Sequence, residues 1–403
     1  MKLKSKSIGA GLFIAGTAIG AGMLSLPISL GVGGIIGATA AMMVGFLYML
    51  ITLFLQLEIL CYQESGKTLI GVSYVYLGRA GELITWGSFL CLLYLASAAY
   101  INGAVDLMTP LGHFFHLDST LLSITFSFVV GLACTFGLKI VDHLNRFLMF
   151  SLTFSFLALV YLITPSIHLG ENLMGEPKYL IVTAPLIVLS FTSHIVLPSA
   201  RVYLEDNIED IKAAMIIGSI TPLVFYLAWI YLIVMLLPFN GDGSIMELTQ
   251  LKSGHLAYLS QILENGFAIK NLRTFYDMFS YFAIITSFLG VTIAIADSIE
   301  DGLGLANNPY KDLIKYPMTL IPPLIVANLS AGFITVLNYG GIFVVLLLGI
   351  IPAIISWIAR YRLKQQSSYT LPGGKSSLIT IAAIGLVVIM IVYFNELGLL
   401  PRP

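Results

Sequence analysis

Eleven stretches of mostly apolar residues divide this chain of 403 residues, and each is close to the length that a helix needs to cross a bilayer. About 20 largely apolar residues span the hydrocarbon core. Charged residues make up only 10% of the chain, against about 25% in an ordinary soluble domain, so most of the surface must face lipid. The stretches cover 7–30, 33–60, 81–109, 119–138, 145–166, 180–200, 212–238, 273–299, 317–336, 339–360 and 377–399.

These stretches predict an all-α, polytopic membrane protein whose residues 1–403 form a single transmembrane domain within the lipid bilayer. The net charge of −1 gives no basic patch for nucleic acid. The three cysteines lack the spacing of a disulfide framework or a metal site. The sequence has neither H-E-x-x-H nor G-x-S-x-G, and no aspartate pair at mid-span. We therefore expect no enzyme activity, no cofactor, no metal, no nucleic-acid partner and no obligate protein partner.

Lysine and arginine predict the orientation, because the cytoplasmic loops of membrane proteins are enriched in both. With the N-terminus inside, 15 of the 20 Lys and Arg residues fall on the inner side and the rest on the outer side. The odd number of spans then places the C-terminus outside. Between the spans, residues 61–80 predict a short interfacial helix, and the longer link at 239–272 predicts small helices of its own.

Two of the spans contain residues that interrupt a helix. The first holds "GTAIGAGMLSLP" at 16–27, and the sixth holds "FTSHIVLPS" at 191–199. An interior glycine costs a helix roughly 1 kcal/mol against alanine, and an interior proline about 3 kcal/mol. The two spans are five apart, where two inverted repeats of five helices would place a matched pair of discontinuous helices. The repeats would cover about 7–166 and 180–360, with an extra helix at about 377–399.

An unwound turn in hydrocarbon leaves backbone N–H and C=O groups without partners, at several kcal/mol per group unless they bind something. Free N–H groups at a half-helix N-terminus suit a carboxylate, and free carbonyls suit an ammonium group or a small cation. A zwitterionic amino acid presents both charges, so the pattern predicts an amino acid transporter. The alternative is close helix packing, since Gly16 and Gly20 form a G-x-x-x-G pattern.

Several motifs, in order along the whole chain, resemble those of the hydroxy and aromatic amino acid permeases, bacterial members of the amino acid–polyamine–organocation superfamily. They are "AGTAIGAGMLSLP" at 15–27, "LYLASAAYINGA" at 93–104, "DHLNRFL" at 142–148, "FTSHIVLPS" at 191–199, "TSFLGV" at 286–291 and "YTLPGG" at 369–374. The resemblance implies a leucine-transporter-type fold in a bacterial inner membrane. Ten of its eleven helices would form two inverted halves, with helices 1 and 6 discontinuous and the C-terminus periplasmic.

The resemblance also implies proton symport of an aromatic amino acid by alternating access, with tyrosine as the first prediction. Where close relatives tend to read Phe-Gly-Phe-His in the sixth span, this chain has Thr192 and Ser193 between Phe191 and His194. Two hydroxyls thus replace a glycine and an aromatic ring. A serine/threonine or tryptophan permease of the same fold and a sodium-coupled amino acid symporter therefore stay as alternatives.

The predicted substrate site draws on the first, third and sixth spans, with the amides around Gly20–Gly22 assigned to the carboxylate. Tyr94 and Tyr100 are six residues apart and point to different faces, so we expect one of them at the cavity. Thr192 and Ser193 would meet a hydroxylated side chain or bond back to helix carbonyls. The predicted substrate-binding residues are Thr17, Ile19, Gly20, Ala21, Gly22, Met23, Tyr94, Tyr100, Phe191, Thr192, Ser193 and His194.

The coupling ion, a proton or sodium, has three candidate residues. His194 stands at mid-span, where it would exchange a proton, bind the substrate or tie a freed carbonyl. Thr286 and Ser287 are adjacent hydroxyls that would hold Na⁺ or bond to the backbone. Three carboxylates near span ends are expected to be solvated; they are Glu58, Asp106 and Asp297.

Overall fold

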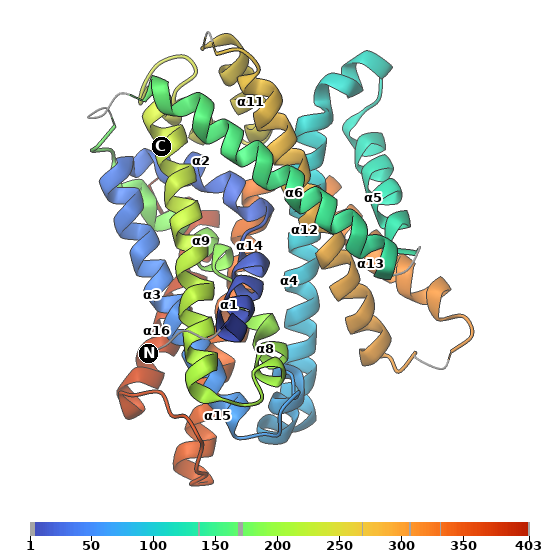
Figure 1. Cartoon of the computed structure of the whole chain (residues 1–403), viewed down its shortest axis with the longest axis vertical. Helices are drawn as coiled ribbons and strands as arrows, with labels where there is room; N and C mark the ends of the chain where they lie inside the picture. The colour runs from blue at the N-terminus through green and yellow to red at the C-terminus, as the bar shows by residue number, and fades with distance from the viewer. Residues whose placement is uncertain are drawn as a thin grey trace.

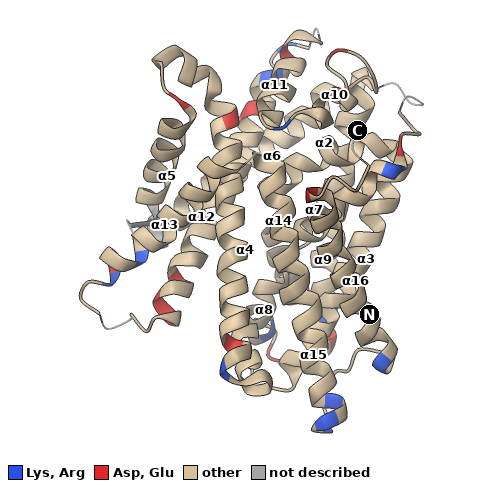
Figure 2. Ribbon diagram, turned by 180° about the vertical axis from the view of Figure 1, so that it is seen from behind, with Lys and Arg blue, Asp and Glu red and all other residues tan. Residues whose placement is uncertain are grey.

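The computed structural model describes residues 5–135, 138–167, 172–267, 269–305, 308–330 and 332–401, apart from the side chains of 134–142. Over these ranges every regular element is a helix, as predicted. Figure 1 shows the helices gathered into an elongated bundle, with α1 near its centre. Most of the charged residues lie toward the two ends of the bundle and few lie between them (Figure 2). This distribution is the one expected of a bundle that crosses a bilayer.

The elements follow one another with short connections. The first half contains α1 (Ser5–Ala18), α2 (Leu26–Leu30), α3 (Gly34–Cys61), α4 (Leu69–Phe115), α5 (Ser119–Thr135) and α6 (Leu138–Ile163). The second half contains α7 (Ala184–Ser190), α8 (Leu197–Tyr203), α9 (Ile208–Leu236), α10 (Ile245–Gln250), α11 (His255–Asn265), α12 (Leu272–Gly302), α13 (Lys311–Leu329), α14 (Phe333–Val345), α15 (Ile351–Trp357) and α16 (Gly374–Glu396).

Eight helical segments of the described chain are long and apolar enough to cross a membrane. One of them, Ala21–Cys61, runs from the end of the first predicted span through the second. The predicted spans at 119–138 and 317–336 correspond to α5 and α13, which are not among the eight. The helix α13 contains three prolines, Pro317, Pro322 and Pro323, and these remove backbone donors that a regular spanning helix would use.

The two links predicted to hold small helices do so. The helix α4 is interrupted at Gly78, whose backbone angles (φ 68°, ψ −164°) are open to glycine and strained for other residues. The interruption separates a short helix that begins at Leu69 from the long span that follows. In the link at 239–272, α10 begins after Ser244, whose side chain accepts a hydrogen bond from the Glu247 amide at 3.2 Å, and α11 follows.

Close backbone contacts hold the interrupted helices in the centre. The helix α1 packs along α9, and α7 packs against α14 and α3. A Cβ atom added to Gly11 would lie 2.8 Å from Ile217 of α9, and one added to Gly218 would lie 2.4 Å from Ile14 of α1. These two glycines therefore permit the approach of α1 to α9, which is the packing role of small residues in membrane helices.

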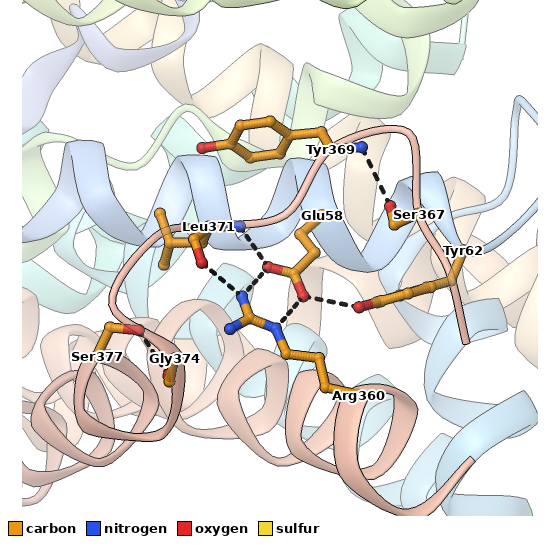
Figure 3. Close-up of polar contacts among 8 residues, drawn as sticks. All are labelled: Glu58, Tyr62, Arg360, Ser367, Tyr369, Leu371, Gly374 and Ser377. Atoms are coloured by element: carbon orange, nitrogen blue, oxygen red, sulfur yellow. Dashed lines mark hydrogen bonds and ion pairs between the residues drawn. The ribbon is translucent and has the colours of Figure 1, made fainter. Parts of the chain in front are cut away.

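A buried ion pair ties α3 to the chain between α15 and α16 (Figure 3). Glu58 is fully buried and is clamped by the guanidinium of Arg360, with Nε 2.6 Å from Oε1. The Leu371 amide donates to Glu58 at 2.8 Å, and the Leu371 carbonyl accepts from Arg360 at 2.9 Å. Tyr62 donates to the same carboxylate at 2.8 Å. The prediction that Glu58 is solvated is therefore wrong, because Arg360, 302 residues along the chain, supplies the counter-charge.

Candidate functional site

A cavity of about 610 Å³ lies where α1 and α7 are interrupted, with α4 and α12 forming further walls. Its volume is within the range of about 300–1,000 Å³ typical of small-molecule sites. The predicted residues that line it are Thr17, Ile19, Gly20, Gly22, Tyr100, Thr192, Thr286 and Ser287. The predicted residues outside its lining are Ala21, Met23, Tyr94, Phe191, Ser193 and His194.

The first helix stops at Ala18, and the chain crosses the cavity wall in an extended turn before the 3-10 segment Ala21–Ser25. Gly20 has extended backbone angles (φ −151°, ψ −165°), and the Ala21 amide donates to Ser287 Oγ at 2.9 Å. A Cβ atom added to Gly20 would lie 2.7 Å from the same Oγ atom. Glycine is thus required at this position so that α12 can approach the interrupted turn.

The interruption leaves backbone groups free beside the cavity. Among the hydrogen bonds of the described residues, the amides of Gly20 and Gly22 find no acceptor, and the carbonyls of Ile19 and Thr192 find no donor. All four residues line the cavity. Buried backbone groups are nearly always paired, so donors and acceptors left free around one cavity indicate a site for a polar guest.

The second interruption follows Ser190 at the end of α7, and helical structure resumes with the 3-10 segment His194–Val196 and α8. Thr192 lies in the cavity wall, and its hydroxyl also reaches the Val188 carbonyl at 3.4 Å. Phe191 is buried, with its ring edge-on to Phe46 and to Tyr226 at centroid distances of 5.8 and 5.4 Å. Phe191 therefore supports the wall from behind, whereas Thr192 is presented to the cavity.

A residue that sequence analysis did not single out joins the two interruptions. The Tyr226 hydroxyl, on α9, is 2.6 Å from the Ala18 carbonyl and 2.7 Å from the Ser190 carbonyl. These are the last helical residues of α1 and α7, and Tyr226 is fully buried. One hydroxyl thus bridges the freed ends of both helices, with its single proton shared between the two carbonyls. The sequence gives no sign of this role, because Tyr226 sits in an ordinary apolar span.

His194 lies behind the second interruption, facing α3 and not the cavity. Its side chain is fully buried with Nε2 3.0 Å from Thr52 Oγ1, and its carbonyl accepts from Gln56 Nε2 at 3.2 Å. Its Nδ1 atom has no hydrogen-bond partner among the residues described. This placement favours the interpretation in which His194 ties the interrupted turn to α3.

Of the two tyrosines on α4, Tyr100 lines the cavity. Tyr94 instead donates to the Met318 carbonyl of α13 at 2.8 Å. Ala21 and Met23 are buried in the 3-10 segment, and Ser193 is buried beside Phe191. The predicted site is therefore brought together in part, and the residues outside its lining are buried in the interrupted turns or engaged with α13.

The adjacent hydroxyls of α12 are already engaged with the backbone. Thr286 Oγ1 donates to the Phe282 carbonyl at 2.9 Å, and Ser287 Oγ accepts from the Ala21 amide. Within the described ranges, no group of three or more His, Cys, Asp or Glu side chains could hold a metal ion. These contacts favour the alternative in which the Thr286 and Ser287 hydroxyls bond to the backbone and do not hold Na⁺.

A second cavity of about 420 Å³ adjoins the first, because Leu92, Thr192, Ile195 and Ala294 line both. It extends toward the beginning of the long span of α4 and the end of α12, where its walls carry charged residues. These charged residues are Arg79, Glu82, Asp297 and Asp301. This is the end that the lysine and arginine distribution predicts to be cytoplasmic. Asp297 is exposed there, as expected.

Comparisons with known proteins agree with this architecture. Residues 3–392 match the tryptophan/tyrosine permease family. The chain is 31% identical to the tyrosine-specific transport system 2 of Haemophilus influenzae over 99% of both chains. It is 28% identical to glutamine transporter 2 of Aliivibrio fischeri over 96% of this chain and 98% of that one. Among solved structures, a manganese transporter mutant of Eremococcus coleocola has a TM-score of 0.55 at 16% identity, covering 97% of this chain and 94% of that chain.

The structural likeness shows a shared leucine-transporter-type fold and nothing more, because the sequence identity is low. The family match covers nearly the whole chain and makes it a multi-pass membrane protein related to bacterial permeases. The substrate of such a permease is an amino acid, and the protein is not an enzyme. The chain therefore belongs to the tryptophan/tyrosine permease family.

Proposed function

We propose that this permease imports tyrosine across the bacterial inner membrane by proton symport with alternating access. The observation that carries the proposal is the cavity at the two helix interruptions, where free amides and free carbonyls occur together. The amides of Gly20 and Gly22 would bind the substrate carboxylate. The carbonyls of Ile19 and Thr192 would bind its ammonium group, so one zwitterion would satisfy all four groups.

The substrate side chain would extend between α4 and α12. Tyr100 lies in that part of the wall, as do small and apolar residues that leave room for an aromatic ring. The Thr192 hydroxyl would accept or donate a hydrogen bond to a phenol. This contact would favour tyrosine over phenylalanine, because a buried hydroxyl left without its partner loses about 1–3 kcal/mol.

We also propose the number of spans and their arrangement in repeats. Eleven spans would comprise two inverted repeats, at about 7–166 and 180–360, and an extra helix at about 377–399. In Figure 1 the C-terminus lies higher in the bundle than the N-terminus, which supports an odd number of crossings. With the N-terminus in the cytoplasm, the second cavity opens inward, and the structure corresponds to an inward-facing state in which substrate is released.

Proton symport supplies enough energy for accumulation. One positive charge that moves inward gains about 2.3 kcal/mol per 100 mV of membrane potential. Because about 1.4 kcal/mol corresponds to a tenfold concentration ratio, the potential alone supports accumulation of tens-fold.

A second candidate function is uptake of a smaller, hydroxylated or amide-bearing amino acid, in symport with sodium. Thr192 at the cavity wall favours it, because this hydroxyl stands where close relatives tend to have glycine. The 28% identity to a glutamine transporter also favours an amide-bearing substrate.

Uptake into proteoliposomes distinguishes the two candidates. Labelled tyrosine would be offered under an imposed pH gradient, an imposed sodium gradient, or neither, with unlabelled tryptophan, serine, threonine and glutamine as competitors. We expect accumulation under the pH gradient and competition by aromatic amino acids. Uptake indifferent to both gradients contradicts symport. Absence of labelled-tyrosine uptake, or stronger competition by serine or glutamine than by tryptophan, contradicts an aromatic substrate.

A further inference from the structure

A half-buried carboxylate lies beyond the cavity, toward the end of the bundle opposite the charged vestibule. The backbone amides of Gly254 and Leu256, at the start of α11, lie near the Asp106 carboxylate of α4. Its Oδ2 atom is buried and has no hydrogen-bond partner in the described part of the chain. Asp106 as a whole is half-buried, so the prediction that it is solvated fails for this oxygen only.

No cation balances this carboxylate among the described side chains, because none of the salt bridges includes Asp106. On α12, Arg273 is engaged by Asp277 at 3.3 Å and by Glu264. On α11, His255 is buried with its Nδ1 unpaired. On α14, Tyr339 is the one titratable residue. The helix α13 carries its charged residues in its first two turns, where Lys315 pairs with Glu300 near the vestibule.

A row of hydroxyls leads from this carboxylate toward the cavity. Tyr276 of α12 lies within electrostatic range of Asp106, and Ser280 follows one helical turn later. Both hydroxyls are buried and unpaired among the described residues. Positions 276, 280 and 287 share one face of a helix, and Ser287 lines the cavity. Ser280 and Ser287 are two turns apart on this face, so the row ends at Ser280 and points toward the residue that holds the Ala21 amide.

The Oδ2 atom of Asp106 is thus enclosed without a hydrogen-bond donor or a cation, which is costly for a charged oxygen. Ionisable groups within spans, when they face the interior of the bundle, mark ion and proton pathways. We infer that Asp106 is the residue at which the coupling proton binds when it arrives from the outside, with Tyr276 and Ser280 between it and the substrate cavity. The inference rests on the proposed proton symport. The proton joins the carboxylate on the outer side and leaves it toward the cytoplasm, and no other bond changes.

The test uses the full-length protein in liposomes that contain a pH-sensitive dye. Addition of tyrosine outside, with no imposed gradient, acidifies the lumen if protons enter with it. Asp106→Asn mimics the protonated residue and keeps an oxygen for the α11 amides. We expect it to lose tyrosine-driven acidification and pH-driven accumulation and to retain exchange of labelled against unlabelled tyrosine. The matched control is Asp277→Asn, an outer carboxylate bonded to Ser260 at 2.6 Å, which we expect to stay coupled.

The outcomes distinguish a failure of proton symport from a failure of the role assigned to Asp106. If wild-type protein transports tyrosine without acidification, proton symport itself fails. If wild-type protein acidifies the lumen and Asp106→Asn does so equally, the role of Asp106 is overturned while symport stands, and Asp106 only caps α11. If Asp106→Asn does not fold, the double variant Tyr276→Phe with Ser280→Ala decides. It keeps the carboxyl group and should slow acidification at least about tenfold relative to exchange. An unchanged ratio overturns the inference.

Discussion

The two glycines of the G-x-x-x-G pattern, Gly16 in α1 and Gly20 just after it, act differently. A Cβ atom added to Gly16 would meet nothing within 4 Å, whereas one added to Gly20 would collide with Ser287. Gly16 lines the cavity, and Gly11 is the glycine that packs against α9. The interpretation of Gly16 as a packing residue is therefore wrong, and an alanine at Gly16 would occupy space that belongs to the cavity.

We predict that Gly16→Ala folds as well as the wild type or better, since alanine in a helix is favoured by roughly 0.5–1 kcal/mol over glycine. Its KM for tyrosine should rise because the cavity is smaller. Gly11→Ala is the control, and it should be destabilised by about 1–3 kcal/mol through overpacking against Ile217. Thermal unfolding in detergent and uptake kinetics measure the two effects. A destabilised Gly16→Ala variant with an unchanged KM would contradict the assignment of Gly16 to the cavity wall.

The Tyr226 hydroxyl leads to a second prediction about a single residue. Tyr226→Phe removes the hydroxyl that meets the ends of α1 and α7, so the Ala18 and Ser190 carbonyls lose their shared donor. We expect a loss of about 1–3 kcal/mol in stability and a clear loss of tyrosine binding, because both interruptions shift. The matched variant is Tyr231→Phe, on the same helix, whose hydroxyl bonds to Thr39 alone at 2.7 Å. Equal tyrosine affinity in the two variants would refute the role of Tyr226.

At the scale of elements, the fold depends on ties between segments that are distant in sequence. The chain from 363 to 373 is held against α3 by Glu58, Arg360 and the backbone of Leu371. Hydrophobic spans alone would leave this segment free to move, since lipid and neighbouring helices are equally apolar. A buried pair with additional hydrogen bonds fixes its position.

Breaking this clamp should be strongly destabilising. Arg360→Met leaves the fully buried Glu58 without its partner, and removal of one member of a buried pair costs about 3–5 kcal/mol. Combining it with Glu58→Gln should recover part of the loss, because the uncompensated charge is then gone. The exposed pair of Arg79 and Glu82 is the control, and Arg79→Met should change stability by less than about 1 kcal/mol. Similar unfolding temperatures for Arg79→Met and Arg360→Met would exclude the clamp.

For the whole molecule, the sequence was informative about where helices form and stop. Apolar length located the spans, and glycine, proline and small polar residues located the interruptions near Gly20 and Thr192, because both signals are local. The sequence could not indicate which side of an interrupted turn faces the cavity. Residues Ala21, Met23 and His194 turn away because a 3-10 segment rotates side chains differently from an α-helix.

Partners distant in sequence were also beyond prediction. Glu58 meets Arg360 from 302 residues away, and Tyr226 meets Ala18 from 208 residues away. Neither pairing leaves a trace in local periodicity, so the sequence predicted a solvated carboxylate at Glu58 and made no prediction for Tyr226. The single-domain organisation and the inverted repeats stay predictions.

The most direct test is an experimentally determined structure of the purified protein with tyrosine. The account predicts tyrosine in the cavity, with its carboxylate within hydrogen-bonding distance of the Gly20 and Gly22 amides and its ammonium group near the Ile19 and Thr192 carbonyls. Tyrosine bound elsewhere, or a cavity closed by continuous helices through Gly20 and Thr192, would contradict it.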